Sequence, residues 1–286
     1  MTGRPSLKGK LEHLSTGARL KFVRTRNQLR DNGTKFCFQA RNLLLRHRPI
    51  RFHINGVTFQ MLPAGEVVLK VWAGAGQVRD ELDLLLRLLQ PGQNFLDVGS
   101  GPGLFAVAAG RKLGAGGAVS ALEPAHSNRQ LLCANLRLNG LPETCAIEIA
   151  KEVSSAWPSL DDVIASRKIP KPTVMRVDVA GAEMAILEGS SRLLHDADAP
   201  LLFIRSSAAA TRSFGYHPVE FMWRLQECGY ELFGSAPSRR PSASRRPSAP
   251  DERGRDLCPV DSTYEGMIVA AKPAHPAYPT LAVRRT

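Results

Sequence analysis

The stretch NFLDVGSGPGLFAVAAG, residues 94–110, constrains the fold of this chain more than any other. Its three glycines, Gly99, Gly101 and Gly103, alternate directly after an apolar run that carries Asp97. Glycine loses more conformational freedom on folding than other residues, so this density indicates a backbone that turns tightly or approaches something closely. Apolar run, glycine loop and second apolar run predict strand, loop and helix, the arrangement that holds nucleoside-containing ligands in α/β proteins.

Strand-like and helix-like segments alternate from residue 94 onward. The expected strands are residues 94–98, 118–124, 145–153, 173–179, 200–206, 230–236 and 264–272. A helix-like segment follows each of the first five, and none separates the last two. This alternation predicts an α/β fold with a doubly wound, mostly parallel, seven-stranded sheet, helices on both faces and an antiparallel last strand.

Three sections of the chain are expected before and within this fold. Residues 1–52 form a basic, helical N-terminal extension, and residues 53–93 hold a strand pair around Asn55-Gly56 with a lead-in helix. Residues 94–286 form the sheet domain. A tandem SRRPSA repeat within about 236–257 has almost no apolar residues, so we expect a disordered insertion in a hairpin loop there.

The positive charge is concentrated in the extension. Residues 1–52 contain thirteen Lys and Arg against Glu12 and Asp31, a net charge of +11, whereas the whole chain carries +12. Such a segment can cover an edge of the core domain or bind an anionic partner, either a membrane surface, a nucleic acid or an acidic protein.

No apolar run approaches the length of a membrane span, and the N-terminus has no apolar core of a secretory signal. The five cysteines are scattered, without CxxC pairs or zinc-type spacing. We therefore expect a cytoplasmic protein without integral membrane association, free thiols and no metal site.

Two acids flanking the glycine loop indicate which ligand it holds. The loop lacks the Gly-Lys-Ser/Thr ending of a phosphate-binding loop, and its G-x-G-x-G spacing differs from the dinucleotide pattern. Glu123 closes the next strand, where an acid accepts hydrogen bonds from ribose hydroxyls. Asp97 would repel a phosphate and attract a cationic ligand with an amino group. Together they favour S-adenosyl-L-methionine over NAD or ATP.

Three segments resemble the FkbM-type methyltransferases, a branch of the class I, Rossmann-like enzymes that use S-adenosylmethionine. They are FLDVGSGPGLFAVAAG, VSALEPAHSNRQLLCANLRLNG and SLDDVIASRKIPKPTVMRVDVAGAEMAILEGSSRLL. The resemblance covers roughly residues 65–235 and 266–272, and the third segment is the discriminating one. It implies O-methylation of a hydroxyl on a sugar, glycan or secondary metabolite.

The resemblance assigns roles to individual residues. The predicted cofactor-binding residues are Asp97, Gly99, Ser100, Gly101, Gly103, Glu123 and Pro124. Asp178 and Glu183 are the predicted catalytic pair that organises the acceptor hydroxyl, with Asp178 as base. A helix-capping pair is the alternative interpretation of these two acids. His195 and His217 are rival bases, although each also suits an ordinary position at a helix end or loop.

Departures from the family pattern motivate an alternative function. Ala180 and Arg205 stand where the family usually has acids, and the segment 140–159, with Ser155 near an expected adenine-contacting acid, is short. A catalytically degenerate methyltransferase fold that serves as a binding or scaffold protein is the alternative. A nucleic-acid methyltransferase is a third possibility, suggested by the basic extension but without a base-methylation motif.

Overall fold

The computed structural model describes residues 49–62, 76–148, 157–235, 257–261 and 263–282. The predictions on the basic extension up to residue 48, on the SRRPSA repeat and on Ser155 therefore lie outside the described residues. The contacts divide the chain into two units, residues 1–51 with 61–78 and residues 52–60 with 79–286. The β1–β2 hairpin residues 52–60 group with the sheet domain, and the predicted sections 1–52, 53–93 and 94–286 stay predictions.

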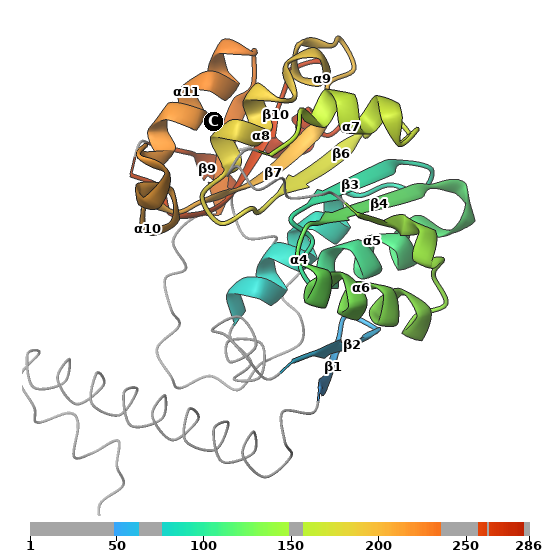
Figure 1. Ribbon diagram of the computed structural model, residues 1–286. Coiled ribbons are helices and arrows are strands. Elements are labelled where there is room, and N and C mark those ends of the chain that lie inside the picture. Colours follow the sequence, from blue (N-terminus) through green and yellow to red (C-terminus); the bar gives the residue numbers. More distant parts are fainter. Residues whose placement is uncertain (1–48, 63–75, 149–156, 236–256, 262, 283–286) are drawn as a thin grey trace, which may run out of the picture. The chain divides into compact units, whose positions relative to one another are not determined.

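The strands form a two-stranded sheet and an eight-stranded sheet (Figure 1). The small sheet pairs β1 (Ile50–Ile54) with β2 (Val57–Met61). The strands of the large sheet are β3 (Asn94–Val98), β4 (Ala118–Glu123), β5 (Ala146–Glu148), β6 (Val174–Val177), β7 (Leu201–Ser206), β8 (Glu231–Ser235), β9 (Leu257–Pro259) and β10 (Gly266–Ala271). Its order is β5-β4-β3-β6-β7-β10-β8-β9.

This order confirms the predicted doubly wound sheet. β3 pairs in parallel with β4 on one side and β6 on the other, and the β4–β5 and β6–β7 pairs are also parallel. β10 is antiparallel to both β7 and β8, which confirms the predicted antiparallel last strand. The seven predicted strands are present, and the three-residue β9 adds an eighth at the β8 edge.

Helices cover both faces of the large sheet. The helices are α4 (Gly76–Leu88), α5 (Leu104–Leu113), α6 (His126–Leu138), α7 (Leu160–Ser166), α8 (Glu183–Glu188), α9 (Ser191–His195), α10 (Ala208–Thr211), α11 (Pro218–Glu227) and α12 (Tyr278–Ala282), with 3-10 turns η1 (Gly114–Gly116), η2 (Glu143–Cys145) and η3 (Arg212–Phe214). Figure 1 shows α4, α5 and α6 on one side of the sheet and α7, α8, α9 and α11 on the other. The predicted two-layer covering is therefore present.

Strand alternation explains what each face contains. Leu96, Met175 and Leu202 point to the α7–α11 face and belong to one buried apolar cluster with Phe221. The neighbours in sequence, such as Asp97 and Arg176, are adjacent partners in the β3–β6 register and share the opposite face. Asp97 and Arg176 are thus buried charged residues on the face opposite the apolar cluster.

One segment that was predicted as a single helix forms two helices in the structure. The helix-like segment 181–195 breaks between α8 and α9, at Gly189 and Ser190. A Cβ on Gly189 would lie 3.1 Å from Leu160 N and Ser159 Cα, so α7 packs directly on the break. The Ser190 hydroxyl donates to the Ile186 carbonyl at 2.5 Å. This close packing of α7 accounts for the interruption.

Candidate functional site

The site lies where the strand order reverses, at the carboxyl ends of β3 and β6. β4 and β5 lie on one side of β3, and β6 and β7 on the other, which opens a crevice at this edge in doubly wound sheets. Two loops meet there, residues 99–103 after β3 and residues 178–182 after β6. A Cβ on Gly99 would lie 2.3 Å from the Asp178 carbonyl oxygen, so the two loops are in direct contact.

The three glycines of the first loop have different reasons to be glycine. All three have positive φ, 78° at Gly99, 56° at Gly101 and 90° at Gly103. A Cβ on Gly103 would lie 2.3 Å from Leu132 Cδ1 of α6. The backbone contact with Asp178 therefore requires glycine at position 99, whereas the left-handed backbone is the main reason for glycine at position 103. Gly101 has nothing within 4 Å of its Cβ position, so it alone faces open space.

Glu123 closes β4 beside the open glycine. Its buried carboxylate accepts from the Gly101 amide through Oε2 at 2.7 Å. Oε1 accepts from the Ala125 amide at 2.9 Å and from Asn128 Nδ2 at 3.3 Å. Pro124, also a predicted cofactor residue, is half-buried between these partners. The structure thus brings Gly101, Glu123 and Pro124 together as predicted, and it shows that Glu123 also holds the loop.

Asp97 is fully buried before the loop. Its Oδ1 accepts from Arg176 Nη1 at 2.8 Å, whereas Oδ2 is buried and has no hydrogen-bond partner in the described part of the chain. The Ser100 hydroxyl oxygen is likewise buried and unpartnered there. Burial raises the pKa of Asp97, and the Arg176 guanidinium offsets only part of that rise. Two buried polar atoms with unused bonding capacity, one in the strand before the glycine loop and one in the loop itself, therefore lie close together in the sequence.

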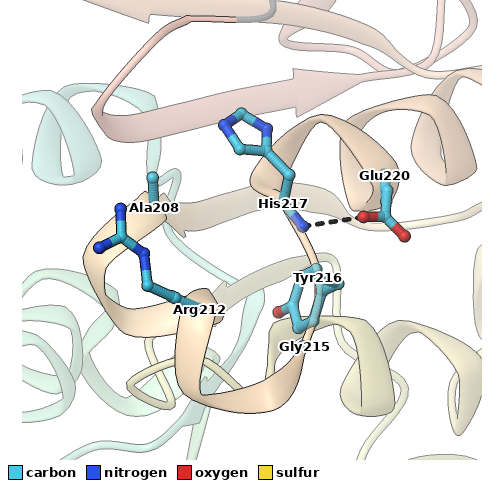
Figure 2. Close-up of a pocket in the computed structure, with 6 residues that line it drawn as sticks. All are labelled: Ala208, Arg212, Gly215, Tyr216, His217 and Glu220. Carbon is cyan, nitrogen blue, oxygen red and sulfur yellow. Dashed lines mark hydrogen bonds between the residues drawn. The ribbon is translucent and has the colours of Figure 1, made fainter.

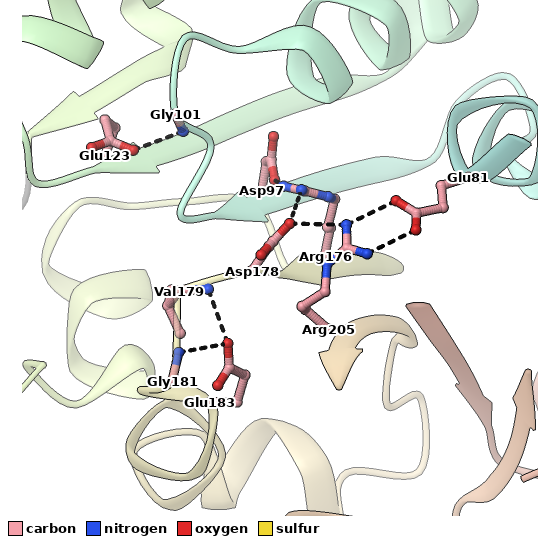
Figure 3. Close-up of polar contacts among 10 residues, drawn as sticks. All are labelled: Glu81, Asp97, Gly101, Glu123, Arg176, Asp178, Val179, Gly181, Glu183 and Arg205. Carbon is pink, nitrogen blue, oxygen red and sulfur yellow. Dashed lines mark hydrogen bonds and ion pairs between the residues drawn. The ribbon is translucent and has the colours of Figure 1, made fainter. Parts of the chain in front are cut away.

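Asp178 lies in a chain of charged side chains on the α4–α5 face (Figure 3). Its Oδ2 accepts from Arg176 Nη2 at 2.5 Å and from Arg205 Nη2 at 3.3 Å. Arg205 also donates to both carboxylate oxygens of Glu81 on α4, at 2.7 and 2.8 Å. The chain therefore runs Glu81, Arg205, Asp178, Arg176, Asp97, and it joins the predicted base to a predicted cofactor residue.

Both arginines keep their charge in this setting. Burial would lower the pKa of Arg205, but its bonds to Glu81 and the charge of Asp178 raise that pKa overall. Burial is likewise outweighed at Arg176, where Asp97 and Asp178 raise the pKa. The Arg176 guanidinium carbon also lies 4.0 Å from the centre of the Phe105 ring, a cation–π contact.

Arg176 and Glu81 are not among the predicted site residues, and Arg205 was predicted only as a departure from the family pattern. A charged residue within the apolar strand segment TVMRVDV was the available signal, because a buried charge needs a partner. Glu81 had no such signal, since it lies on an amphipathic helix 124 residues before Arg205.

Glu183, the second predicted catalytic acid, is 1% exposed at the start of α8. Its Oε1 accepts from the amides of Val179 and Gly181, at 3.3 and 3.2 Å. The Tyr216 hydroxyl donates to the Gly181 carbonyl at 2.8 Å and lies 3.3 Å from Glu183 Oε2. Burial raises the pKa of Glu183, while these amides lower it in part. Its contacts are those of a residue that holds the β6–α8 turn.

The two histidines that sequence analysis considered as bases lie at helix ends. His217 caps α11: its Nδ1 accepts from the Val219 amide at 3.3 Å, and its own amide donates to Glu220 at 2.8 Å. His195 ends α9, with Nδ1 2.8 Å from the Ser191 carbonyl oxygen. Helix-end positions explain both residues.

A pocket of about 430 Å³ follows β7 (Figure 2). Its lining consists of Ala208, Arg212, Gly215, Tyr216, His217 and Glu220. Because His217 Nδ1 accepts from an amide, the neutral ring carries its proton on Nε2 and can donate. Tyr216 links the pocket wall to the turn after Asp178 through its bond to Gly181. The pocket therefore offers donors from Arg212 and His217 next to the β6–α8 turn.

Among the described residues, no group of three or more His, Cys, Asp or Glu side chains could hold a metal ion. In the same part of the chain, no helix combines the length and apolar character that crossing a bilayer requires.

Comparison with known proteins gives matches to solved structures alone. No family model matches the chain, and no curated protein matches its sequence. A precorrin-6y C5,15-methyltransferase from Geobacter metallireducens is 15% identical over 67% of this chain and 86% of that one, with a TM-score of 0.40. TYW2 from M. jannaschii in complex with AdoMet is 12% identical over 78% and 84%, with a TM-score of 0.43.

A SAM-dependent O-methyltransferase from Thermotoga maritima is 16% identical over 81% of this chain and 80% of that one, with a TM-score of 0.40. At these identities and TM-scores the matches decide neither activity nor substrate. The assignment of a Rossmann-like fold rests on the strand order described above.

Proposed function

We propose that this chain is an S-adenosylmethionine-dependent methyltransferase of the FkbM type that methylates a hydroxyl oxygen of a small molecule or glycan. One observation carries the proposal. The open Gly101, its partner Glu123 and the unpartnered Oδ2 of Asp97 lie together at the switch point of a doubly wound sheet. No phosphate-binding sequence accompanies them.

The residues fit this cofactor by the chemistry of their donors and acceptors. Asp97 Oδ2 can accept from an ammonium group, since a buried carboxylate oxygen without a partner is costly. Glu123 Oε2 has one lone pair left beside Gly101 and can accept from a ribose hydroxyl. When bound, S-adenosylmethionine supplies a methyl group activated by a positively charged sulfur.

Asp178 is the proposed acceptor of the hydroxyl proton. Arg176 and Arg205 both bind its Oδ2, which fixes the carboxylate and leaves Oδ1 without a partner among the described residues. A hydroxyl that donates to Oδ1 would be held in position, and Oδ1 would take up the hydroxyl proton when the oxygen accepts the methyl group and the methyl–sulfur bond breaks.

We propose that the acceptor enters from the pocket beside the β6–α8 turn. β6 and β7 are parallel neighbours, so the loops that follow them share one sheet edge. Arg212 and His217 line the pocket as donors suited to the oxygens of a polyhydroxylated molecule. Arg212→Ala should raise the acceptor KM about tenfold with little change in cofactor affinity, as expected for one lost charge-assisted hydrogen bond.

Calorimetric titration with S-adenosylmethionine, S-adenosylhomocysteine and NAD tests the cofactor assignment. The first two should bind at micromolar Kd and NAD should not. Glu123→Gln should weaken binding at least about tenfold, because one oxygen becomes a donor. Glu188→Gln, an exposed acid on α8, is the matched control and should leave the Kd unchanged. A folded protein that binds neither cofactor form would contradict the proposal.

One observation favours the second candidate, a degenerate methyltransferase fold that acts as a scaffold. Each predicted acid already has a partner inside the chain: Arg176 for Asp97, Gly101 for Glu123 and two arginines for Asp178. Methyl transfer to any acceptor that disappears in Asp178→Asn would exclude this candidate. The third candidate, a nucleic-acid methyltransferase, depends on the basic extension outside the described residues.

A further inference from the structure

Asn135 of α6 and Asn139 at its C-terminal cap form hydrogen bonds with the free edge of β2, the second strand of the hairpin. Asn135 Oδ1 accepts from the Gln60 amide at 2.9 Å, and its Nδ2 donates to the Gln60 carbonyl at 2.9 Å. Asn139 repeats the pattern at Thr58, accepting from the amide at 3.2 Å and donating to the carbonyl at 2.7 Å. The free edge of β2 is thus paired with side-chain amides.

The spacing of the four residues explains this match. Four residues of an α-helix rise about 6.0 Å, and two residues of a strand rise about 6.6 Å. Asn135 and Asn139 are four apart, whereas Thr58 and Gln60 are two apart and present the same strand edge. Each asparagine therefore meets one residue of β2.

Asn135 makes one bond that Asn139 does not. The second hydrogen of its Nδ2 is donated to the Pro102 carbonyl at 2.8 Å, inside the glycine loop. The side chain is 0% exposed, and both hydrogens and the oxygen of its amide are used. The reverse amide orientation would place its oxygen against two carbonyl oxygens, so the network fixes the orientation.

The loop is thereby held at two adjacent residues. Glu123 binds the Gly101 amide, and Asn135 binds the Pro102 carbonyl. We propose that Asn135 is a positioning residue that couples the hairpin 52–60 to the glycine loop, so that hairpin contacts set the conformation in which the loop meets its ligand. Its effect on the ligand is indirect, through the loop, and this last step rests on the proposed function.

Asn135→Ala and Asn139→Ala form a matched pair, because each removes the same amide from the same hairpin. Hydrogen exchange followed by mass spectrometry should show faster exchange in peptides covering the hairpin for both variants. Only Asn135→Ala should also accelerate exchange in the peptide covering residues 99–103, by about tenfold for one lost hydrogen bond of roughly 1.4 kcal/mol. Asn139→Ala should leave that peptide unchanged.

Cofactor affinity is the second measurement. Asn135→Ala should raise the Kd for S-adenosylmethionine about tenfold, and Asn139→Ala should leave it within about threefold. Equal effects of the two variants on loop exchange, or none from either, would overturn the coupling. If Asn135→Ala does not fold, Asn135→Ser takes its place, since the shorter hydroxyl side chain cannot span Gln60 and Pro102 together.

Failure of the proposed function would give a different experimental result from failure of the coupling. Wild-type protein that binds no S-adenosylmethionine contradicts the function, while the exchange comparison still decides whether Asn135 couples hairpin and loop.

Discussion

Arg205 and Glu81 form a bidentate ion pair, in which Nη1 and Nη2 of the arginine donate to separate oxygens of the glutamate at 2.7 and 2.8 Å. Arg205 is the last residue but one of β7 and Glu81 belongs to α4, so the pair ties the lead-in helix to the sheet. The same arginine reaches Asp178 at 3.3 Å. An acid supplied by α4 thus neutralises the arginine that replaces an expected acid at this strand end.

Glu81→Gln should destabilise the protein by about 2 kcal/mol, below the 3–5 kcal/mol of a fully buried pair because the Arg205 side chain is 22% exposed. Urea unfolding followed by circular dichroism measures the change. The double variant Glu81→Met with Arg205→Met should recover most of the loss, because both charges of the pair are removed and Asp178 keeps Arg176 as its partner. A double variant as unstable as the sum of both single changes would show that the pair itself is not what Glu81 contributes.

The glycine loop provides a second matched pair of variants. Gly99→Ala combines a left-handed backbone with a Cβ placed 2.3 Å from the Asp178 carbonyl, so it should cost at least about 3 kcal/mol. Gly101→Ala meets open space and should cost only about 1–2 kcal/mol of backbone strain. Its methyl group enters the proposed cofactor space, however, so titration should show the larger loss of binding for this more stable variant. Unchanged binding in folded Gly101→Ala would contradict that assignment of space.

The sequence predicted the strands and helices because apolar periodicity and glycine punctuation act locally. It also brought Gly101 and Glu123 together correctly, since both positions follow from the order strand, loop, helix, strand. The ion pairs could not be predicted from the sequence. Arg176 contacts Asp97 only because of the β3–β6 register, and Glu81 and Arg205 are 124 residues apart in the sequence. Those partners depend on the order of strands in the sheet, which residue types alone do not encode.

His275 should make stability fall in mild acid. Its Nδ1 accepts from the Ala277 amide at 3.1 Å, and its Nε2 lies 3.4 Å from the Thr173 carbonyl oxygen. Burial lowers the pKa of this ring below its ordinary value of 6.5, although the Thr173 carbonyl acts in the opposite direction. The unfolded chain then binds the proton first, so the free energy of unfolding decreases as the pH falls through 6.5 toward the native value.

Urea unfolding at several pH values between 5 and 7.5 measures that slope. His275→Asn keeps an acceptor for Ala277 and removes the titrating ring, so its slope should be smaller than that of the wild type. His126→Asn, an exposed histidine at the start of α6, is the control. Identical slopes for wild type and His275→Asn would rule out this contribution.

Glu183→Gln separates the two interpretations of the second acid. Burial raises the pKa of Glu183. As the pH rises, the native state therefore keeps this proton to a higher pH than the unfolded chain, in which the pKa is near 4.5. The free energy of unfolding therefore decreases as the pH rises from 4.5 through the native pKa. Gln keeps an oxygen for the Val179 and Gly181 amides and carries no charge, so Glu183→Gln should gain stability relative to wild type on going from pH 5 to pH 8.

Turnover decides the role of that carboxylate, measured beside stability with Glu188→Gln, an exposed acid of the same helix, as control. If Glu183 only holds the β6–α8 turn, kcat of Glu183→Gln should stay within about tenfold of the wild-type value, because the hydrogen bonds of the turn survive. If Glu183 instead exchanges a proton with the acceptor, Glu183→Gln should lower kcat about 10²–10⁴-fold. We expect the smaller loss, since the carboxylate is 1% exposed and its contacts belong to the turn and Tyr216. A loss above a hundredfold with unchanged stability would return Glu183 to the catalytic pair with Asp178.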